Sequence, residues 1–147
     1  MIPAVVPDIP PMSAEDVERV RRLENQVLAR PQVSLRTDHV LHAGMYARTV
    51  CLPPDTLLTG ALIKIATTLV ISGDVLVFTG GETRRLVGYH VLAATAGRKQ
   101  AFIACAETHI TMIFPTQATT VEQAEAEFTD EADRLMSRKH GLTTTEQ

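Results

Sequence analysis

Tryptophan is absent from the sequence, and aromatic residues make up only 4% of it. Surfaces that stack nucleic-acid bases or sugars depend on such rings, so we expect no surface of either kind. A strong excess of one charge is also lacking, because the net charge is only −3, and this argues against direct reading of nucleic acid. No apolar run reaches the ~20 residues that a membrane-spanning helix needs. These absences predict a soluble protein that is made in the cytoplasm and does not enter a membrane.

Only two cysteines, Cys51 and Cys105, occur among the 147 residues. The N-terminal residues lack the basic stretch and the cleavage site of a secretion signal, so we expect two reduced thiols and not a disulfide. A chain of this length can form one hydrophobic core without covalent or metal support. Hydrophobic residues make up 45% of the sequence, which is typical of a globular domain.

Prolines are concentrated at the start of the chain, where residues 1–12 hold four of the eight. Proline fixes φ and lacks an amide donor, so this segment is predicted to be an extended arm. The arm either frays, as termini commonly do, or packs on its own domain or on a neighbouring subunit. The candidate contacts of such an interaction arm are its apolar residues, namely Ile2, Val5, Val6 and Ile9.

Two amphipathic helices are predicted, one near each end of the chain. Residues 13–30 carry an apolar stripe at helical spacing, with Ser13 as the N-cap and a proline after the last turn. Residues 119–141 are predicted to form a closing helix that packs on the core, because Thr120 and Gln123 have the spacing of a capping box. Residues 142–147 are expected to be a flexible tail.

Between the helices, residues 31–118 consist of short β segments separated by turn residues. Gly80-Gly81 lies between two such segments and predicts a tight hairpin, and Ala43-Gly44 predicts another turn. Gly73-Asp74 is interpreted as a further reversal, which would separate a strand within 62–72 from a strand at 75–78. Eight or more strands without intervening helices predict a mainly β fold, an antiparallel sandwich or small barrel.

One long part of the sequence resembles a known superfamily. Three segments follow one another along the chain: "HVLHAGMYARTVCLPPDTLLTG", "ISGD" and "AGRKQAFIACAETHITMIFPT". A predicted glycine hairpin lies between the last two, and a predicted acidic helix follows them. In this order the chain is similar to the cupins, and more narrowly to small cupin-like proteins often encoded by phages and prophages. The similarity runs from about His39 to Phe128. It implies that residues 31–118 form a cupin-like antiparallel jelly roll.

In such cupins, histidines on adjacent barrel strands hold a metal ion. Carried over to this chain, the first histidine cluster falls on Ile63, Ile65 and Thr67, and the last falls on Cys105. One thiolate alone is not a site, because zinc and iron centres need about three protein ligands. The resemblance therefore implies a barrel that has lost its inherited metal site, holds no cofactor and packs isoleucine in its interior.

Other residues offer weaker signs of a metal site or a catalytic group. His90 and His109 are the candidate ligands of a relocated metal site, provided that their strands are neighbours. Cys105, Glu107 and His109 alternate along one segment and could share a face as a thiol–base–acid set. A small buried thiol is the simpler interpretation of Cys105.

Two pairs of basic residues occur near predicted turns, at Arg84-Arg85 and Arg98-Lys99. Together they could form a basic patch that binds an acidic partner. Ordinary solvated side chains explain them as well, because most exposed charges have no binding role. We therefore interpret both pairs as surface residues.

These observations favour a non-enzymatic structural or interaction protein. Its expected partners are a second copy of itself, with a dimer favoured, and other structural proteins. The resemblance to phage-encoded proteins makes the most concrete version a virion-associated protein that cements or decorates a capsid shell. The alternative is a small-molecule-binding or metal-dependent cupin enzyme or sensor, which would use a relocated site or an apolar pocket.

Overall fold

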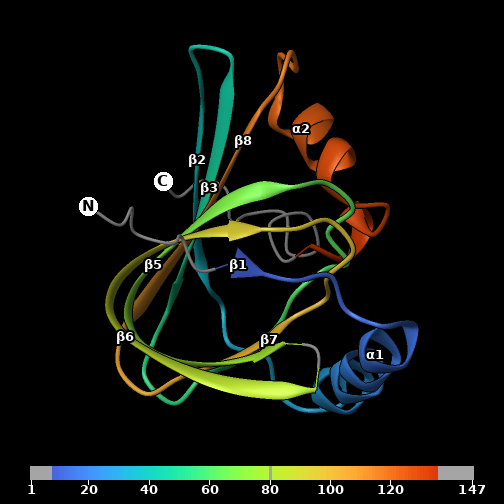
Figure 1. Cartoon of the computed structure of the whole chain (residues 1–147), viewed down its shortest axis with the longest axis vertical. Helices are drawn as coiled ribbons and strands as arrows, with labels where there is room; N and C mark the ends of the chain where they lie inside the picture. Colours follow the sequence, from blue (N-terminus) through green and yellow to red (C-terminus); the bar gives the residue numbers. More distant parts are fainter. Residues whose placement is uncertain (1–7, 80, 136–147) are drawn as a thin grey trace, which may run out of the picture.

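The computed structural model describes residues 8–79 and 81–135, which form a curled, mainly β structure flanked by helices (Figure 1). Its strands are β1 (Asp8–Ile9), β2 (Arg36–His42), β3 (Met45–Leu52), β4 (Leu57–Thr59), β5 (Thr67–Thr79), β6 (Glu82–Ala94), β7 (Ala101–Ala104) and β8 (Thr108–Pro115). The helices are α1 (Ala14–Leu28), α2 (Val121–Phe128) and the short 3₁₀ helix η1 (Ala132–Arg134). Within the described residues, we find no helix with the length and apolar character needed to cross a membrane.

The strands follow the order β1-β6-β5-β8-β3-β2, and β4 joins the sheet through β7. All pairs are antiparallel apart from the two-residue β1–β6 pair. β5 changes its partner midway: up to Ser72 it pairs with β8, and from Val75 it pairs with β7. This change lets the sheet fold over on itself, so that its inner faces enclose the core. The predicted antiparallel jelly roll is confirmed.

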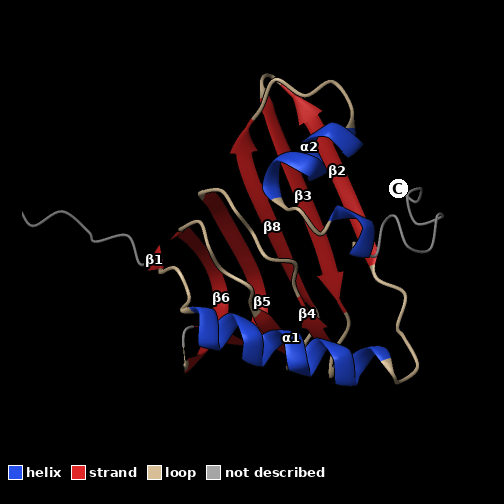
Figure 2. Cartoon of the chain, turned by 90° about the vertical axis from the view of Figure 1, so that its right-hand side faces the viewer, coloured by secondary structure: helices blue, strands red, loops and turns tan. Residues whose placement is uncertain are grey.

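The core lies on the concave side of the curled sheet, where alternate residues of the strands point inward. It includes Ile9, Leu35, Tyr46, Leu52, Leu69, Ile71, Val75, Val77, Leu92, Phe102, Ile110, Met112, Phe114 and Phe128. Figure 2 shows α1 running across one end of the strands, whereas α2 lies against β3 and β2 near the other end. An ion pair of 2.9 Å joins Arg48 of β3 to Glu125 of α2.

β5 and β6 form a tight hairpin between Thr79 and Glu82, as the glycine pair predicts, because these two residues pair with each other. The second interpretation, a reversal at Gly73-Asp74, is wrong. Gly73 lies inside a continuous β5, opposite Gly88 of β6, and the φ angles of these glycines are 149° and 93°. The hairpin bends strongly (Figure 1). A bend of this kind uses the same residue types as a turn, and this explains the error.

The helix caps are present as the sequence indicates. Ser13 Oγ accepts a hydrogen bond of 3.1 Å from the Asp16 amide, and Thr120 Oγ1 accepts one of 3.2 Å from the Gln123 amide. The closing helix is shorter than predicted, since α2 ends at Phe128 and Thr129 is extended. The Phe128 carbonyl accepts from the Lys64 amide at 2.8 Å, so a tertiary contact holds this helix end. The predicted helical residues 136–141 and the tail 142–147 lie outside the described residues.

Only the second half of the predicted arm is described, so Ile2, Val5 and Val6 lie outside the described residues. Ile9 is 2% exposed and belongs to the core of its own chain, where β1 pairs with the end of β6. Its carbonyl accepts a hydrogen bond of 2.9 Å from the Thr95 amide. This part of the arm packs on its own jelly roll, and Ile9 is not available to a partner.

Candidate functional site

The positions that would carry metal ligands do not form one cluster. Ile63 borders a hollow that is partly open to solvent, and Ile65 packs against the core from the same segment before β5. Thr67 is the first residue of β5 and is buried. Cys105 is exposed in the turn between β7 and β8 and does not border that hollow, so the expected small buried thiol is not found there.

A guanidinium group occupies the place beside Thr67. The Arg98 Nη2 atom donates to Thr67 Oγ1 at 2.7 Å, and the Arg98 side chain is buried. In the described part of the chain, no group of three His, Cys, Asp or Glu side chains is placed to hold a metal ion. A fixed positive charge beside the inherited position also repels a cation. The residues present therefore do not fit the metal centre that is typical of cupins.

The two candidate ligands of a relocated site are separated by strand β5. His90 pairs in register with Ile71, and Ile71 pairs with Ile110 on the other side. His90 therefore shares a face with Ile110, whereas His109, one residue earlier on β8, points to the opposite face. The His90 Nε2 atom lies 2.9 Å from the Val87 carbonyl oxygen. The geometry does not bring His90 and His109 together on one metal ion.

The suggested thiol–base–acid set does not assemble around Cys105. It is Cys51 that lies near the carboxylate, with its Sγ atom 3.8 Å from Glu107 Oε2, and Cys51 pairs in register with His109. Burial and the adjacent Glu107 carboxylate raise the pKa of the Cys51 thiol. A raised thiol pKa lowers the fraction of the reactive thiolate, so this group is a poor nucleophile.

A hollow of about 380 Å³, here called the cavity, is partly open to solvent and lies between the strands of the jelly roll and the end of α1. Its walls are mostly hydrocarbon and come from strands on both sides, including Leu35, Val50, Leu58, Ile63, Leu69, Phe102, Ile110 and Met112. Residues at the end of α1 and in the segment before β2 border it as well. Such a cavity can accept an apolar molecule of moderate size.

Two polar side chains, Arg98 and Gln100, border the same cavity and are almost completely buried, at 1% and 5% exposed. The Arg98 guanidinium donates to Gln100 Oε1 at 3.2 Å and to the Thr95 carbonyl at 2.7 Å, besides Thr67. Burial lowers the pKa of Arg98 to about 10, which still leaves it charged at neutral pH. Among the described residues, the Gln100 Nε2 atom has no hydrogen-bond partner.

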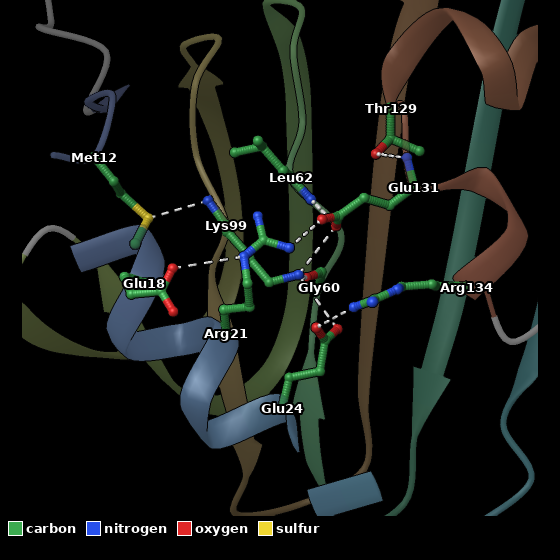
Figure 3. A network of polar contacts seen from close by, with 10 residues as sticks. All are labelled: Met12, Glu18, Arg21, Glu24, Gly60, Leu62, Lys99, Thr129, Glu131 and Arg134. Carbon is green, nitrogen blue, oxygen red and sulfur yellow. Dashed lines mark hydrogen bonds and ion pairs between the residues drawn. The ribbon is translucent and has the colours of Figure 1, made fainter. Parts of the chain in front are cut away.

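The neighbouring Lys99 anchors a polar network (Figure 3). Its Nζ atom, fully buried, donates to the Gly60 carbonyl at 2.9 Å, to Glu24 at 3.2 Å and to Glu131 at 3.1 Å. An ammonium group has three donors, so these three acceptors satisfy it completely. The network joins α1, the β4 end and the segment after α2 at one atom.

Further cations surround the two carboxylates of this network. Arg21 lies 2.6 Å from Glu131, and Arg134 lies 3.3 Å from Glu24. Burial would raise the pKa of Glu131, but hydrogen bonds from the Leu62 amide, Arg21 and Lys99 outweigh it and lower the pKa to about 2. Glu131 is therefore ionised throughout the neutral range, and its ion pairs with Arg21 and Lys99 persist there.

The sequence interpretation of Arg98-Lys99 as surface charges is wrong, because both side chains are buried. The other pair is on the surface, where Arg84 binds Glu82 at 3.1 Å and Arg85 binds Asp74 at 2.7 Å. Sequence reasoning also missed Gln100, Glu24 and Glu131 as parts of the site. The local signal for Gln100 is that it ends a polar triplet directly before the apolar strand "AFIA", and this does not distinguish a buried residue from a solvated one. Glu24 and Glu131 lie elsewhere in the chain, and their burial depends on distant partners.

No family model matches the chain, and no curated protein matches it. Solved structures do match. Salicylate 1,2-dioxygenase from Pseudoaminobacter salicylatoxidans superposes with a TM-score of 0.50 at 12% identity, over 78% of this chain and 33% of that chain. KdgF from Halomonas sp. superposes with a TM-score of 0.49 at 16% identity, over 61% of this chain and 86% of that chain. A Cupin_2 domain of an XRE family transcriptional regulator from Enterobacter cloacae superposes with a TM-score of 0.47 at 15% identity, over 56% of this chain and 99% of that chain.

Sequence identities this low support a similarity of fold and not one of function. The strand order, the curled antiparallel sheet and the superposition on salicylate 1,2-dioxygenase together define an antiparallel jelly roll. Within that fold, the described site is a mostly apolar cavity bordered by the buried guanidinium groups of Arg48 and Arg98 and by the buried amide of Gln100, instead of a cluster of metal ligands.

Proposed function

We propose that this jelly roll binds a small, largely apolar molecule inside its cavity, without the help of a metal ion. The observation that carries the proposal is the cavity itself. Its volume of about 380 Å³ lies within the range of roughly 300–1,000 Å³ that is usual for ligand pockets. A few polar groups in mostly hydrocarbon walls are also typical of such pockets, because they orient a ligand that the walls hold by burial.

The network around Lys99 supports this proposal because it fixes the elements that border the cavity. Glu24 of α1 and Glu131 of the segment after α2 both border it, and both are held by the same ammonium group. A cavity whose walls are held in place binds with a smaller loss of conformational entropy. We further propose that the protein binds its ligand and does not convert it, as the sequence predicts.

The test fills the cavity and measures binding of octanamide, a neutral molecule with an apolar chain. Val50→Phe places a large ring at the wall, and Val87→Phe makes the same change at an exposed position of β6. We expect the wild type and Val87→Phe to bind octanamide with the same dissociation constant by calorimetry. We expect Val50→Phe to lose at least about tenfold in affinity, because the ring excludes the ligand.

Thermal unfolding of both variants accompanies the titrations, so that a folded Val50→Phe protein is used for the comparison. If the folded Val50→Phe protein binds octanamide as tightly as the wild type, the cavity is not the binding site. If the wild type takes up neither octanamide nor a charged molecule with the same chain, the proposal is wrong.

A second candidate function, contact with another copy of the chain, has its own support in β6. Val87, Tyr89 and Val91 are 60%, 71% and 45% exposed, and alternate spacing places them on one face. In the described part of the chain, β6 pairs along its outer edge only through Ala93 and Ala94. A free strand edge is satisfied by another strand, and two copies of β6 can pair symmetrically.

This candidate predicts a dimer in solution that Tyr89→Lys converts to a monomer, as measured by light scattering with Arg22→Glu as the surface-charge control. A wild type that is monomeric at all concentrations would exclude it. The narrower idea, a cement or decoration protein of a phage capsid, rests on the sequence resemblance and stays a prediction. Mass spectrometry of purified particles tests it directly.

A further inference from the structure

We infer that the ligand of the cavity carries a carboxylate group, which the buried pair Arg98 and Gln100 binds. This inference rests on the proposed function, because it names the chemical class of the same ligand. Its first support is the position of Arg98 at the cavity wall with 1% exposure. A buried guanidinium is costly unless an anion or several acceptors compensate it.

The compensation for Arg98 from the described protein is incomplete. Its three hydrogen bonds go to a hydroxyl, a carbonyl and an amide oxygen, all of them neutral acceptors. No carboxylate within the described ranges forms an ion pair with it. A guanidinium has five N–H donors, so two of them are left for a ligand.

Gln100 adds donors and no acceptors. Its Oε1 atom accepts from Arg98 Nε, and this contact fixes which end of the amide is oxygen, because the guanidinium can only donate. The NH₂ end therefore faces away from Arg98, and Nε2 is buried with no partner among the described groups. Two kinds of donor border the cavity side by side, and a carboxylate has two acceptor oxygens to meet them.

The other charges near the cavity do not cancel that of Arg98. Glu24 and Glu131 border the cavity, but they are engaged by Lys99, Arg21 and Arg134. Within that network two carboxylates face three cations. Asp55 is a further carboxylate at the cavity, and it forms no ion pair with Arg98 among the described residues. Arg48, which also borders the cavity, is bound to Glu125.

The body of the ligand follows from the rest of the lining. Phe102, Ile110 and Met112 border the same cavity as Arg98 and Gln100, and they offer only hydrocarbon, an aromatic ring and a thioether. A free inorganic anion would leave this surface uncovered. A carboxylate with an apolar chain or ring satisfies both parts of the site at once.

The experiment compares octanoate with octanamide, which has the same chain and no charge, by calorimetry at pH 7 on the full chain. We expect the wild type to bind octanoate at least about tenfold more tightly, because charge-assisted hydrogen bonds are stronger than neutral ones. Gln100→Glu places a carboxylate beside Arg98 with almost no change of shape. It should lose at least about tenfold in affinity for octanoate, and clearly less for octanamide, because the neutral amide is not repelled by the new carboxylate.

Gln26→Glu makes the same change of charge at an exposed position of α1 and serves as the matched control. We expect it to bind both molecules as the wild type does. Equal affinity of the wild type for octanoate and octanamide would overturn the carboxylate inference and leave the proposed function standing. Undiminished octanoate binding by Gln100→Glu would overturn it too. Failure of both molecules to bind would instead overturn the proposed function.

Discussion

The Oγ1 atom of Thr108 lies 2.5 Å from the point that a Cβ atom on Gly73 would occupy. The same hydroxyl group also receives a hydrogen bond of 3.1 Å from the Asp74 amide. The start of β8 thus packs directly on the middle of β5, at the point where β5 changes from one partner strand to the other. Glycine at position 73 makes this close approach possible.

Replacement of this glycine is expected to destabilise the jelly roll strongly. Gly73→Ala meets both Thr108 and the Glu107 carbonyl at 2.7 Å, and the φ of 149° adds backbone strain. We expect a loss of about 3 kcal/mol or more in the free energy of unfolding, measured by urea denaturation. Gly88→Ala is the control, because φ is 93° there and no atom lies within 4 Å, so only the strain of about 1 kcal/mol applies. Equal losses for both variants would contradict the close approach of Thr108.

Lys99→Met tests the polar network at its centre. The variant leaves Glu24 and Glu131 buried without the ammonium group between them, so we expect a loss of about 3–5 kcal/mol in the free energy of unfolding. Lys64→Met removes an exposed lysine that pairs with Asp130, and it should change stability by less than about 1 kcal/mol. Urea denaturation of both variants makes the comparison. A mild effect at Lys99, similar to that at Lys64, would show that the network contributes little.

The lowered pKa of Glu131 predicts how stability depends on pH. Its ordinary pKa is 4.5 and its folded value is about 2, so the unfolded chain takes up this proton first. The stabilisation is therefore complete above pH 4.5 and is lost as the pH falls toward 2. Glu131→Gln removes it, so the variant should be less stable than the wild type at pH 7. The difference should shrink progressively below pH 4.5, and urea denaturation at several pH values measures it. A difference that stays constant down to pH 2.5 would contradict the assignment.

Ile63→His tests whether the inherited metal position can be restored. Arg98 already donates to Thr67, and its own carbonyl accepts from the Ile63 amide at 2.8 Å, so a cationic group stands next to the new imidazole. We expect no stoichiometric metal by mass spectrometry. We also expect a loss of about 1–3 kcal/mol in stability, because a partly buried imidazole replaces hydrocarbon. Tight binding of zinc or nickel by this variant would show that the site still accommodates a metal.

Features set by neighbouring residues could be predicted from the sequence. The cap at Ser13, the turn at Ala43-Gly44 and the hairpin between Thr79 and Glu82 depend on side chains and φ angles within a few positions. Because such turns recur between alternating strands, an antiparallel sandwich or small barrel could be predicted from the residues. The jelly roll in particular was implied by the resemblance to cupins.

Features set by distant residues could not be predicted in the same way. Gly73 has the local pattern of a turn, and only the packing of Thr108 identifies it as a bend. Lys99 has the local sequence pattern of a surface lysine, because its partner Glu24 lies 75 positions earlier in the chain. The end of α2 at Phe128 also depends on a contact, with Lys64. Periodicity and capping patterns contain no information about these partners.

The network around Lys99 also constrains the order of events when the chain is synthesised. The strands up to β8 leave the ribosome before Glu131 does, and until then the buried ammonium has only Glu24 and one carbonyl as partners. Chains fold progressively during synthesis, so a nascent jelly roll passes through a stage with an undercompensated charge in its interior. The polar network can therefore form completely only after the residues that follow Phe128 have been synthesised. Ribosome-stalled chains that end before Glu131 should be more sensitive to proteases than the full chain.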